Sequence, residues 1–458
     1  GSKRLVAYIV PSPDLEGEME GVSLSDEGII QEWTDVFDTQ YEASDAAELP
    51  DFDIIGWDSS FTHSPIPAQE MREWLDCTLE RLLPLTTGSV LEVGCGTGML
   101  LFPIVEQCEN YVGLDVSSTV LKALETRLTD NQIDTSHVSL HEGEAGDIDG
   151  VSDGMFDCII LNSVSQYFPS FSYLDDFLEK AIKQTSEGGH IFIGDVRNML
   201  SLKAFHGAVE LYRADPGAQA GDFLPHIVRQ AHLDRELVVA PEYFLALADR
   251  FSQISSVDVE LKASQAWNEL TLFRYDVTIH LSTGTIDTPA FTPTIKPGNG
   301  LGCNELGDLF SNFDGTHLVV EGVALRSLYE VSHAFQVMES GGDKTVGDLR
   351  QESRQVCSAL AEPSDIYALA QQYNLNVSVS PSGTGHYDRC DVLIWRQGLE
   401  AFHGSQLERS IDYQGALSNN PQAFWQHPQF IKVLRSGLVD QLPDYMVPSG
   451  FVLLDALP

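Results

Sequence analysis

Val90-Leu91-Glu92-Val93-Gly94-Cys95-Gly96-Thr97-Gly98 is the stretch that decides the fold of this chain of 458 residues. An apolar strand runs directly into a turn whose three glycines are spaced GxGxG. Glycines at these places permit a tight turn from strand to helix and let a ligand approach the backbone, while the amides of the helix beyond offer hydrogen-bond donors. Met99 stands where a dinucleotide-binding fingerprint has its third glycine. The pattern therefore predicts a strand-turn-helix site for a nucleotide-type ligand.

Two carboxylates near this turn narrow the kind of ligand. Glu92 precedes the turn by two residues, where it would repel a pyrophosphate but suits the cationic amino-acid end of S-adenosylmethionine. Asp115 ends the next predicted strand, close to the spacing at which an acidic residue binds ribose hydroxyls. Either carboxylate alone is also compatible with an ordinary strand end. Together with the glycines, the two favour S-adenosylmethionine.

Strands and helices alternate regularly between residues 88 and 281. The predicted strands are SVLEV (89–93), NYVGLD (110–115), HVSLHEG (137–143), FDCIILN (156–162), GGHIFIGDV (188–196), VDVELK (257–262) and FRYDVTIHL (273–281). Amphipathic helices are predicted between most of them, one with an N-cap at Ser117. This order predicts an α/β fold with a mostly parallel sheet that binds ligands at the carboxyl ends of its strands. The last two strands lack a helix-length spacer, so we expect an antiparallel hairpin at the sheet edge.

The composition excludes several classes of partner. There are 68 acidic and 26 basic residues, and the formal net charge of -42 predicts repulsion of nucleic acid and of anionic membrane surfaces. Seven cysteines without CxxC spacing predict reduced thiols in a cytoplasmic protein. No apolar run approaches the roughly 20 residues of a membrane span, and we expect no leader peptide. His137 and His141 would lie too far apart along a strand to chelate one metal ion, so we expect no metal site.

Longer segments resemble one family, in its order along the chain. VLEVGCGTGMLLF (90–102) resembles the first motif of class I S-adenosylmethionine-dependent methyltransferases, specifically of those inserted in nonribosomal peptide synthetases. Further segments that resemble this family are GWDSSFTHSPIPAQEMREW (56–74), NSVSQYFPS (162–170), GDVRN (194–198), APEYF (240–244) and NELTLFRYDV (268–277). At the two flanks, KRLVAYIVP (3–11) and LPDYMVPSGFVLLDALP (442–458) resemble pieces of an amino-acid adenylation domain. The resemblance covers the whole chain.

The resemblance implies a methyltransferase that interrupts an adenylation domain. Its core is expected to be Rossmann-like, with a mostly parallel seven-stranded sheet and an antiparallel edge hairpin. The expected division is an adenylation small-subdomain stub at 1–11, a linker and helical lid at 12–87, the S-adenosylmethionine-binding core at 88–281, a linker and smaller auxiliary α/β region at 282–418, and a second stub at 419–458. The auxiliary region would shape the acceptor entrance or dock neighbouring domains.

The resemblance further implies N-methylation of the α-amine of an aminoacyl thioester, held on the phosphopantetheine arm of a carrier protein. The expected partners are the aminoacyl carrier protein and the host adenylation domain in cis, with no nucleic acid and no membrane. Two alternatives stay open. An O- or C-methyltransferase of the same carrier-bound substrate shares every donor motif, and a non-catalytic structural insert would only space the adenylation lobes.

The methyl donor is expected to lie against the ends of the first four strands of the core. After the third strand, Ala145 would pack against the adenine ring and Asp147 would bind its exocyclic amine. By the resemblance, Trp57 belongs with Ser59 and Ser60 to a lid over donor and acceptor. The full set of expected cofactor-binding residues is Trp57, Glu92, Gly94, Cys95, Gly96, Gly98, Asp115, Val116, Ala145, Asp147, Asn162 and Ser163.

Polar residues at the ends of the fourth and fifth strands are candidates for the acceptor side. An amine that attacks a sulfonium carbon needs alignment and an exit for one proton, so the demand on a base is modest. Asn162, Gln166 and Tyr167 either face the reacting nitrogen or cap a turn. Asp195 and Arg197 either form a structural ion pair or line the acceptor pocket.

Two residues are candidates to accept the proton. Glu269 precedes the last predicted strand and would be oriented by Arg274, but it is also compatible with a surface carboxylate. His206, on the helix after the fifth strand, is the alternative base, unless it is a partly buried structural histidine.

An aromatic stripe precedes the core. Trp33, Phe37 and Tyr41 fall at i, i+4 and i+8, which places them on one face if the segment is helical. Such a stripe either packs into a core or belongs to a lid that closes over a ligand.

Overall fold

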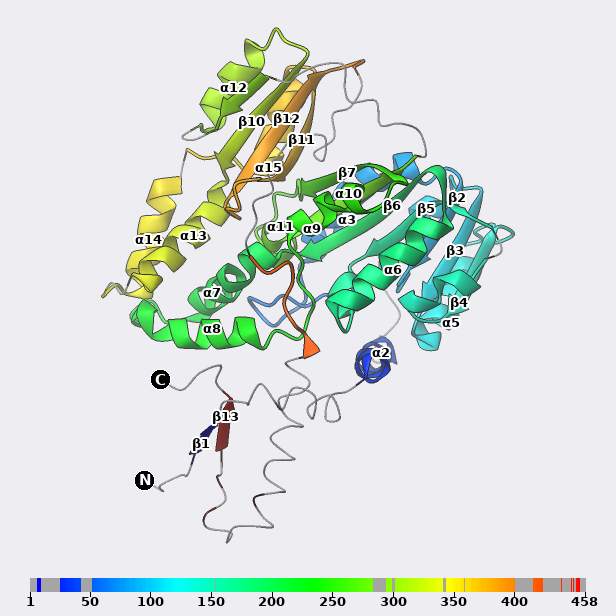
Figure 1. Cartoon of the computed structure of the whole chain (residues 1–458), viewed down its shortest axis with the longest axis horizontal. Coiled ribbons are helices and arrows are strands. Elements are labelled where there is room, and N and C mark those ends of the chain that lie inside the picture. Colours follow the sequence, from blue (N-terminus) through cyan, green and yellow to red (C-terminus); the bar gives the residue numbers. More distant parts are fainter. Residues whose placement is uncertain are drawn as a thin grey trace.

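The computed structural model describes residues 6–9, 25–42, 52–152, 154–282, 294–298, 301–340, 343–357, 359–399, 415–422, 438, 446, 448 and 450–453. These residues form two sheets, their helices and a separate two-stranded ribbon (Figure 1). Most of the two predicted adenylation stubs, and the first part of the predicted linker after residue 12, lie outside the described residues.

A seven-stranded sheet forms the larger unit. Its strand order is β4-β3-β2-β5-β6-β8-β7. The strands are β2 (Ser89–Val93), β3 (Asn110–Asp115), β4 (Val138–Glu142), β5 (Phe156–Asn162), β6 (Thr185–Arg197), β7 (Ile254–Leu261) and β8 (Arg274–Leu281). β2 to β6 pair in parallel, and β8 lies antiparallel between β6 and β7. The predicted mostly parallel, Rossmann-like sheet with an antiparallel edge pair is confirmed, although a short helix, α11 (Glu269–Phe273), lies between β7 and β8.

Apolar side chains bury both faces of this sheet. Because successive strand residues point to opposite faces, Val90 of β2 packs into one hydrophobic cluster and Leu91 into the other. The helices on the Val90 side are α3 (Ala68–Leu82), α4 (Leu101–Val105) and α5 (Ser118–Asp130), and those on the Leu91 side include α6 (Phe171–Gln184), α9 (Pro241–Leu245) and α10 (Leu247–Arg250). Ser117 caps α5 as predicted, since its Oγ accepts from the backbone N–H of Val120 at 3.2 Å.

Additional helices lie around the carboxyl ends of the strands. α2 (Asp26–Glu42) precedes the sheet in the chain, whereas α7 (Leu202–Arg213) and α8 (Leu224–His232) follow β6. Short 3-10 helices follow three strands: η3 (Ala145–Gly150) after β4, η4 (Ser165–Tyr167) after β5 and η5 (Met199–Ser201) after β6. Two more 3-10 helices are η2 (Leu83–Leu85) and η6 (Ala220–Phe223).

A second, four-stranded sheet forms the smaller α/β unit. Its order is β11-β12-β10-β9, with strands β9 (Thr294–Pro297), β10 (His317–Ala324), β11 (Leu375–Pro381) and β12 (Arg389–Arg396). Its helices are α12 (Cys303–Ser311), α13 (Arg326–Glu339), α14 (Val346–Cys357) and α15 (Pro363–Gln372). This sheet and its helices lie within residues 282–418, where the sequence predicts a smaller auxiliary α/β region.

Two hydrogen bonds join the two sheets at Glu260 of β7. Its Oε1 accepts from the Tyr367 hydroxyl at 3.2 Å and from the Ser378 hydroxyl at 3.0 Å. On the side of the larger sheet, Arg81 of α3 lies 3.6 Å from Glu260 and 2.5 Å from Asp276 of β8. The smaller unit is therefore joined to a charged network inside the larger one.

The ribbon pairs two distant parts of the chain. β1 (Val6–Ile9) and β13 (Gly450–Leu453) lie side by side in parallel, with Val6 opposite Gly450 and Ile9 opposite Leu453 (Figure 1). These strands belong to the two flanks that resemble an adenylation domain.

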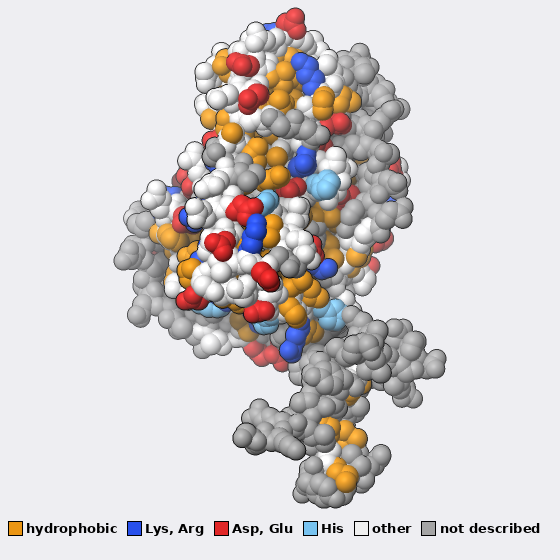
Figure 2. Space-filling model, turned by 90° about the vertical axis from the view of Figure 1, so that its left-hand side faces the viewer, with side chains coloured by type: hydrophobic (Ala, Val, Ile, Leu, Met, Phe, Trp, Pro, Cys, Tyr) orange, Lys and Arg blue, Asp and Glu red, His pale blue; other side chains and the backbone are white. Residues whose placement is uncertain are grey.

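The surface and the helix lengths bear on the predicted partners. On the face shown in Figure 2, acidic, basic and hydrophobic side chains are interspersed and no broad field of basic side chains is visible. In the described part of the chain, every helix is too short or too polar to cross a bilayer.

Gly98 tests how tightly the glycine turn packs. Its φ is +83°, and a Cβ built on it would lie 2.5 Å from Cδ1 of Leu124 in α5. Gly98→Ala should therefore lower the free energy of unfolding by roughly 1–3 kcal/mol, through backbone strain and overpacking. Urea unfolding followed by circular dichroism measures the change. Gly150→Ala is the matched control, since nothing lies within 4 Å of its Cβ position; equal midpoints for the two variants would contradict this packing role.

Candidate functional site

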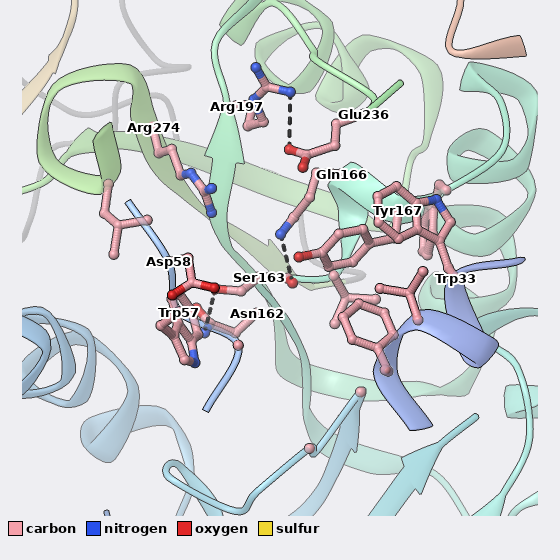
Figure 3. A pocket seen from close by; sticks show the side chains of 18 of the residues that line it. Trp33, Trp57, Asp58, Asn162, Ser163, Gln166, Tyr167, Arg197, Glu236 and Arg274 are labelled. Carbon is pink, nitrogen blue, oxygen red and sulfur yellow. Dashed lines mark hydrogen bonds and ion pairs between the residues drawn. The ribbon is translucent and has the colours of Figure 1, made fainter. Parts of the chain in front are cut away.

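A cavity of about 830 Å³ opens at the carboxyl ends of β2, β3, β5 and β6. This volume lies in the range of roughly 300–1,000 Å³ that is usual for small-molecule sites. Side chains of α2, α7, α8 and the 55–63 loop complete its walls. In Figure 3, Trp33 and Tyr167 lie together on one side of the cavity, and Arg197 and Glu236 lie above them. The cavity occupies the place at which the sequence predicts the ligand.

Two of the three glycines in the turn line this cavity. Gly94 and Gly96 have φ values of +74° and +49°, and both line the cavity together with Cys95. A Cβ on Gly94 would lie 2.3 Å from Val164, whereas the space beside Gly96 has its nearest atom, the Tyr41 hydroxyl oxygen, at 3.6 Å. Gly98 differs from its predicted role, because it packs against α5 and does not line the cavity.

Glu92 is a buried carboxyl group at the floor of the cavity. Its Oε2 accepts a hydrogen bond from the Tyr111 hydroxyl. Burial raises the pKa of Glu92 to about 8, although the bond from Tyr111 lowers it. A cation bound beside this group would favour its ionised form. The position therefore suits the cationic end of the predicted donor.

Asp115 lies at the end of β3 and also lines the cavity. Its Oδ2 accepts from the Gly96 N–H at 2.8 Å and its Oδ1 accepts from the Ser117 N–H at 3.0 Å. Burial raises the pKa of Asp115, while these hydrogen bonds lower it. Each carboxylate oxygen has lone-pair capacity beyond these bonds, so the group can still accept from a ligand hydroxyl.

The segment after β4 contributes a different carboxylate from the one predicted. Ala145 and Val116 line the cavity as expected. Asp147 does not line it, because its Oδ2 accepts from the Glu144 N–H at 3.0 Å in a capping box that begins η3. Glu144 lines the cavity instead, next to Ala145. A helix cap has thus engaged the side chain that we expected to meet adenine.

The aromatic stripe of α2 lies against the cavity. Trp33, Phe37 and Tyr41 all line it. The ring of Tyr167 packs between two of them, with centroid distances of 4.6 Å to Trp33 and 4.9 Å to Phe37 (Figure 3). Asp38 fixes the helix, since its Oδ1 accepts from the Ser117 hydroxyl at 2.5 Å. These contacts favour the lid interpretation of the stripe over a purely structural core.

Two buried amide oxygens beyond β5 accept no hydrogen bond from the described residues. They are Oδ1 of Asn162 and Oε1 of Gln166, whose side chains are 8% and 2% exposed. Their amide nitrogens are engaged, because Asn162 donates to the Ser163 hydroxyl at 3.3 Å and Gln166 donates to the Ser163 carbonyl at 2.9 Å. Both residues line the cavity. Since a buried acceptor without a donor is costly, this pair suits a ligand that brings N–H or O–H groups.

Asp195 lies beneath the cavity and does not line it. The register of β6 shifts between Ile193 and Val196, and Asp195 has a φ of +65°, so its carboxylate turns into the interior. There it pairs with Arg274 at 2.5 Å and Lys262 at 3.4 Å. Burial by itself raises the pKa of Asp195, but these two cations hold it below its ordinary value. The prediction that Asp195 pairs with Arg197 or faces the acceptor is therefore wrong.

Ser163 connects this buried carboxylate to the cavity. Its hydroxyl donates to Asp195 Oδ2 at 2.9 Å, and its φ of +58° is unusual for a residue with a side chain. The indole N–H of Trp74 adds a bond to Asp195 Oδ1 at 3.3 Å, and the ring of Trp57, which lines the cavity, packs on Trp74 at 4.8 Å. Asp195 itself does not line the cavity. It holds Ser163, and through Trp74 the ring of Trp57, and both of these residues line it.

Arg197 lies at the other end of the cavity, in a charged cluster. It donates two parallel hydrogen bonds to Asp234, at 2.9 and 2.8 Å, and one to Glu236 at 3.0 Å (Figure 3). Nε2 of His206 lies 3.0 Å from Asp234 Oδ2. Burial alone raises the pKa of Asp234, but Arg197 and His206 hold it below its ordinary value. The four residues line the cavity together.

Glu269 also lines the cavity, but its partners differ from those predicted. Its two carboxylate oxygens accept from the Ser59 hydroxyl, at 3.2 Å, and from the Ser60 N–H. Glu269 therefore holds the predicted lid segment in place. Arg274 does not orient it, because Arg274 is the ion-pair partner of Asp195.

Several cavity residues were missed by the sequence analysis. They are Glu144, Arg213, Asp234, Arg235 and Glu236. The charged run 234–236 precedes an apolar stretch without matching a motif, and it reaches Arg197 because Val239 N–H donates to the Arg197 carbonyl at 2.9 Å. The spacing of Glu144 and Asp147 is that of a capping box, so the sequence could have indicated that Asp147 caps a helix.

Among the described residues, no three His, Cys, Asp or Glu side chains are grouped to hold a metal ion.

Comparison with known proteins gives the family context of the chain. Residues 91–191 match a family model described as a methyltransferase domain. Chondramide synthase of Chondromyces crocatus is 34% identical over 477 residues, covering 100% of this chain and 12% of the synthase. The nonribosomal peptide synthetase CymA of Salinispora arenicola is 37% identical over 444 residues, covering 94% of this chain and 5% of CymA. The chain thus spans a small part of these relatives.

Solved structures resemble the structure of this chain only weakly, with low TM-scores. The N-methyltransferase NodS of Bradyrhizobium japonicum aligns with a TM-score of 0.32 and 15% identity, over 47% of this chain and 96% of NodS. Magnesium protoporphyrin IX methyltransferase of Synechocystis aligns with a TM-score of 0.37 and 11% identity, over 56% of this chain and 100% of that enzyme. At these scores the likeness carries no argument about function. The family match at residues 91–191 agrees with the predicted methyltransferase domain, and the chain is similar along most of its length to parts of chondramide synthase and of CymA.

Asp115 provides a test of donor binding. Asp115→Asn keeps the shape of the side chain but removes the charge that would accept from ribose hydroxyls. Affinity for S-adenosylmethionine should fall by about 1–3 kcal/mol, measured by isothermal titration calorimetry. Asp130→Asn, at the exposed end of α5, is the control. Unchanged donor affinity in Asp115→Asn would refute the ribose assignment.

The pH dependence of S-adenosylmethionine binding tests the role of Glu92. Its pKa of about 8 in the free protein should fall when a cation binds beside it. Binding of S-adenosylmethionine would then release a proton, so affinity should rise between pH 6 and 7.5, by up to about tenfold per pH unit. Calorimetry in buffers of different ionisation enthalpy would count the proton. Glu92→Gln should bind more weakly and without this slope; a slope that persists in the variant would assign the proton to another group.

Proposed function

We propose that this chain, which matches a methyltransferase family model at residues 91–191 and is similar to parts of chondramide synthase and of CymA, uses S-adenosylmethionine to methylate the α-amine of an aminoacyl thioester. The thioester would be held on the phosphopantetheine arm of a carrier protein. The observation that supports the choice of nitrogen is the pair of buried amide oxygens, Asn162 Oδ1 and Gln166 Oε1. Both belong to residues that line the cavity, and neither accepts a hydrogen bond from the described residues. A primary amine brings two N–H groups, one for each oxygen.

The donor half of the cavity fits the predicted cofactor. Glu92 would face the amino-acid end, Asp115 would accept from ribose hydroxyls, and Ala145 with Glu144 would meet adenine. When bound, S-adenosylmethionine supplies a methyl group on a positively charged sulfur. The aromatic side chains of α2, above Gly96, would exclude water from this half and strengthen its electrostatic interactions.

The acceptor residues would act mainly by positioning. If both amine hydrogens are bound by Asn162 and Gln166, the nitrogen lone pair is left for in-line attack on the methyl carbon. The new N–C bond forms as the S–C bond breaks, and the nitrogen then carries a positive charge and one proton in excess. Ser163 would hold both amides in place, because it accepts a hydrogen bond from each through its hydroxyl and carbonyl oxygens.

His206 is the residue that we propose to take up this proton. Its Nε2 is engaged with Asp234, which leaves Nδ1 to accept. Arg197 holds Asp234 in its ionised form, and Asp234 in turn fixes the orientation of the imidazole through Nε2. Glu269 is less suited to this role, since its two oxygens accept from the lid segment.

The partners are proposed from the relatives and from the ribbon. The chain matches only 12% of chondramide synthase and 5% of CymA, so a carrier protein and an adenylation domain elsewhere in the same synthetase are proposals here. The parallel pairing of β1 with β13 supports an insertion, because it brings together the two flanks that resemble an adenylation subdomain.

Labelled methyl transfer onto a panel of aminoacyl carrier proteins tests the function. Tandem mass spectrometry of the released amino acid locates the methyl group. We expect a single methyl on the α-nitrogen, and no transfer to a carrier loaded with the matching α-hydroxy acid. A methyl group found on oxygen or carbon would replace the N-methyltransferase assignment.

Gln166 tests the positioning mechanism. Gln166→Met keeps the length of the side chain and removes the buried acceptor. One lost hydrogen bond to the reacting amine, worth about 1–3 kcal/mol, should lower kcat roughly 10- to 100-fold while donor affinity stays the same. The control is Gln253→Met, at an exposed position beside the start of β7. An unchanged kcat would show that Gln166 does not bind the amine.

A further inference from the structure

Two large aromatic side chains are exposed together beside the cavity. Tyr212, at the end of α7, is 49% exposed, and Trp267, in the loop before α11, is 44% exposed. Their rings stack with centroids 6.2 Å apart. Both also pack on Phe61, which is itself buried, at 5.4 Å and 5.0 Å. We call Phe61, Tyr212 and Trp267 the aromatic platform.

The platform borders the cavity mouth without facing into it. Ser60 and Arg213, which adjoin Phe61 and Tyr212 in the chain, line the cavity, whereas the three platform residues do not. Arg213 ties the two segments together, because its guanidinium donates to the carbonyls of Ser60 and of Phe61, the latter at 3.1 Å. The platform and the rim of the cavity therefore form one continuous surface.

Hydrogen bonds hold the platform rigid. The Arg350 guanidinium, from α14 of the smaller unit, donates to the carbonyls of Tyr212 and Ala214 at 3.1 Å each and to that of Leu211. The end of α7 is thereby fixed before any partner binds. A rigid exposed surface loses little conformational entropy on binding, which is the property of a preformed docking site.

The chemistry of the platform is that of a protein interface. Tyrosine, tryptophan and arginine are the residue types that most often dominate binding energy between proteins. Among the described residues, Tyr212 and Trp267 are the aromatic side chains that stand out as exposed, and they lie in contact with each other. Arg213 adds a cation at the edge of this surface, in a chain whose formal net charge is -42. The surface therefore suits an apolar patch with acidic residues near it.

We propose that the aromatic platform docks the carrier protein that delivers the acceptor. The inference rests on the proposed function, which requires a tethered aminoacyl group to enter this mouth. The arm is a narrow chain and would contact the lining residues, such as Ser60 and Arg213. A wider body must stay outside while the arm is inside, and the platform is the apolar surface that it would cover.

The experiment compares two acceptors that differ only in the carrier. One is the aminoacyl carrier protein, and the other is the same aminoacyl group on free pantetheine, which has the arm without the protein. Using the full chain, initial rates give KM and kcat for wild type, Tyr212→Ala, Trp267→Ala and the double variant. The control is Met155→Ala, which removes an apolar side chain 52% exposed on the loop before β5.

We expect the platform variants to raise KM for the carrier-bound acceptor by about tenfold or more, with kcat/KM for aminoacyl-pantetheine unchanged. Equal losses on both acceptors would overturn the proposal, because the platform would then support the lid or the arm. No change on either acceptor would also overturn it. A change of oligomeric state in size-exclusion chromatography would assign the platform to a second copy of the chain. If wild type methylates neither acceptor, the proposed function itself fails.

Discussion

The buried ion pairs of Asp195 are the interaction on which the rest of this site depends. Lys262 and Arg274 neutralise a carboxylate that is fully shielded from solvent, and loss of either cation would leave a charge that costs about 3–5 kcal/mol to keep buried. The same carboxylate accepts from Ser163, whose own oxygens hold the amides of Asn162 and Gln166. The register shift in β6 therefore positions Ser163 and, through it, the side-chain amides of Asn162 and Gln166.

The donor half was predictable from the sequence because its signals are local. Gly94 and Gly96 follow one strand and Asp115 ends the next, so the order of strands alone brings them to one edge. The acceptor half was not predictable in the same way. Strand residues two apart normally share a face, but the register shift in β6 turns Asp195 inward while Arg197 faces the cavity. The partners of Arg197 come from the segment 234–236, whose approach depends on tertiary contacts.

The smaller α/β unit takes part in the same electrostatic network. Tyr367 and Ser378 bind Glu260, Arg81 lies between Glu260 and Asp276, and Asp276 in turn lies 2.6 Å from Lys262. The backbone N–H of Asp195 also donates to Asp276 at 2.8 Å. A chain of hydrogen bonds and ion pairs thus runs from the second sheet to the floor of the cavity. The buried residues Asp195, Lys262 and Asp276 all belong to this chain.

The ribbon of β1 and β13 has a topological consequence. Parallel neighbours in a sheet need a crossover, which in most α/β proteins is about a dozen residues or more and usually a helix. Between Ile9 and Gly450 the crossover contains the seven-stranded and the four-stranded sheet. Strands pair about 4.8 Å apart regardless of what connects them, so the ribbon can keep its register whether the link is short or holds both of these units. Such a joint would let a catalytic unit be gained or lost in evolution without redesign of the domain that carries it.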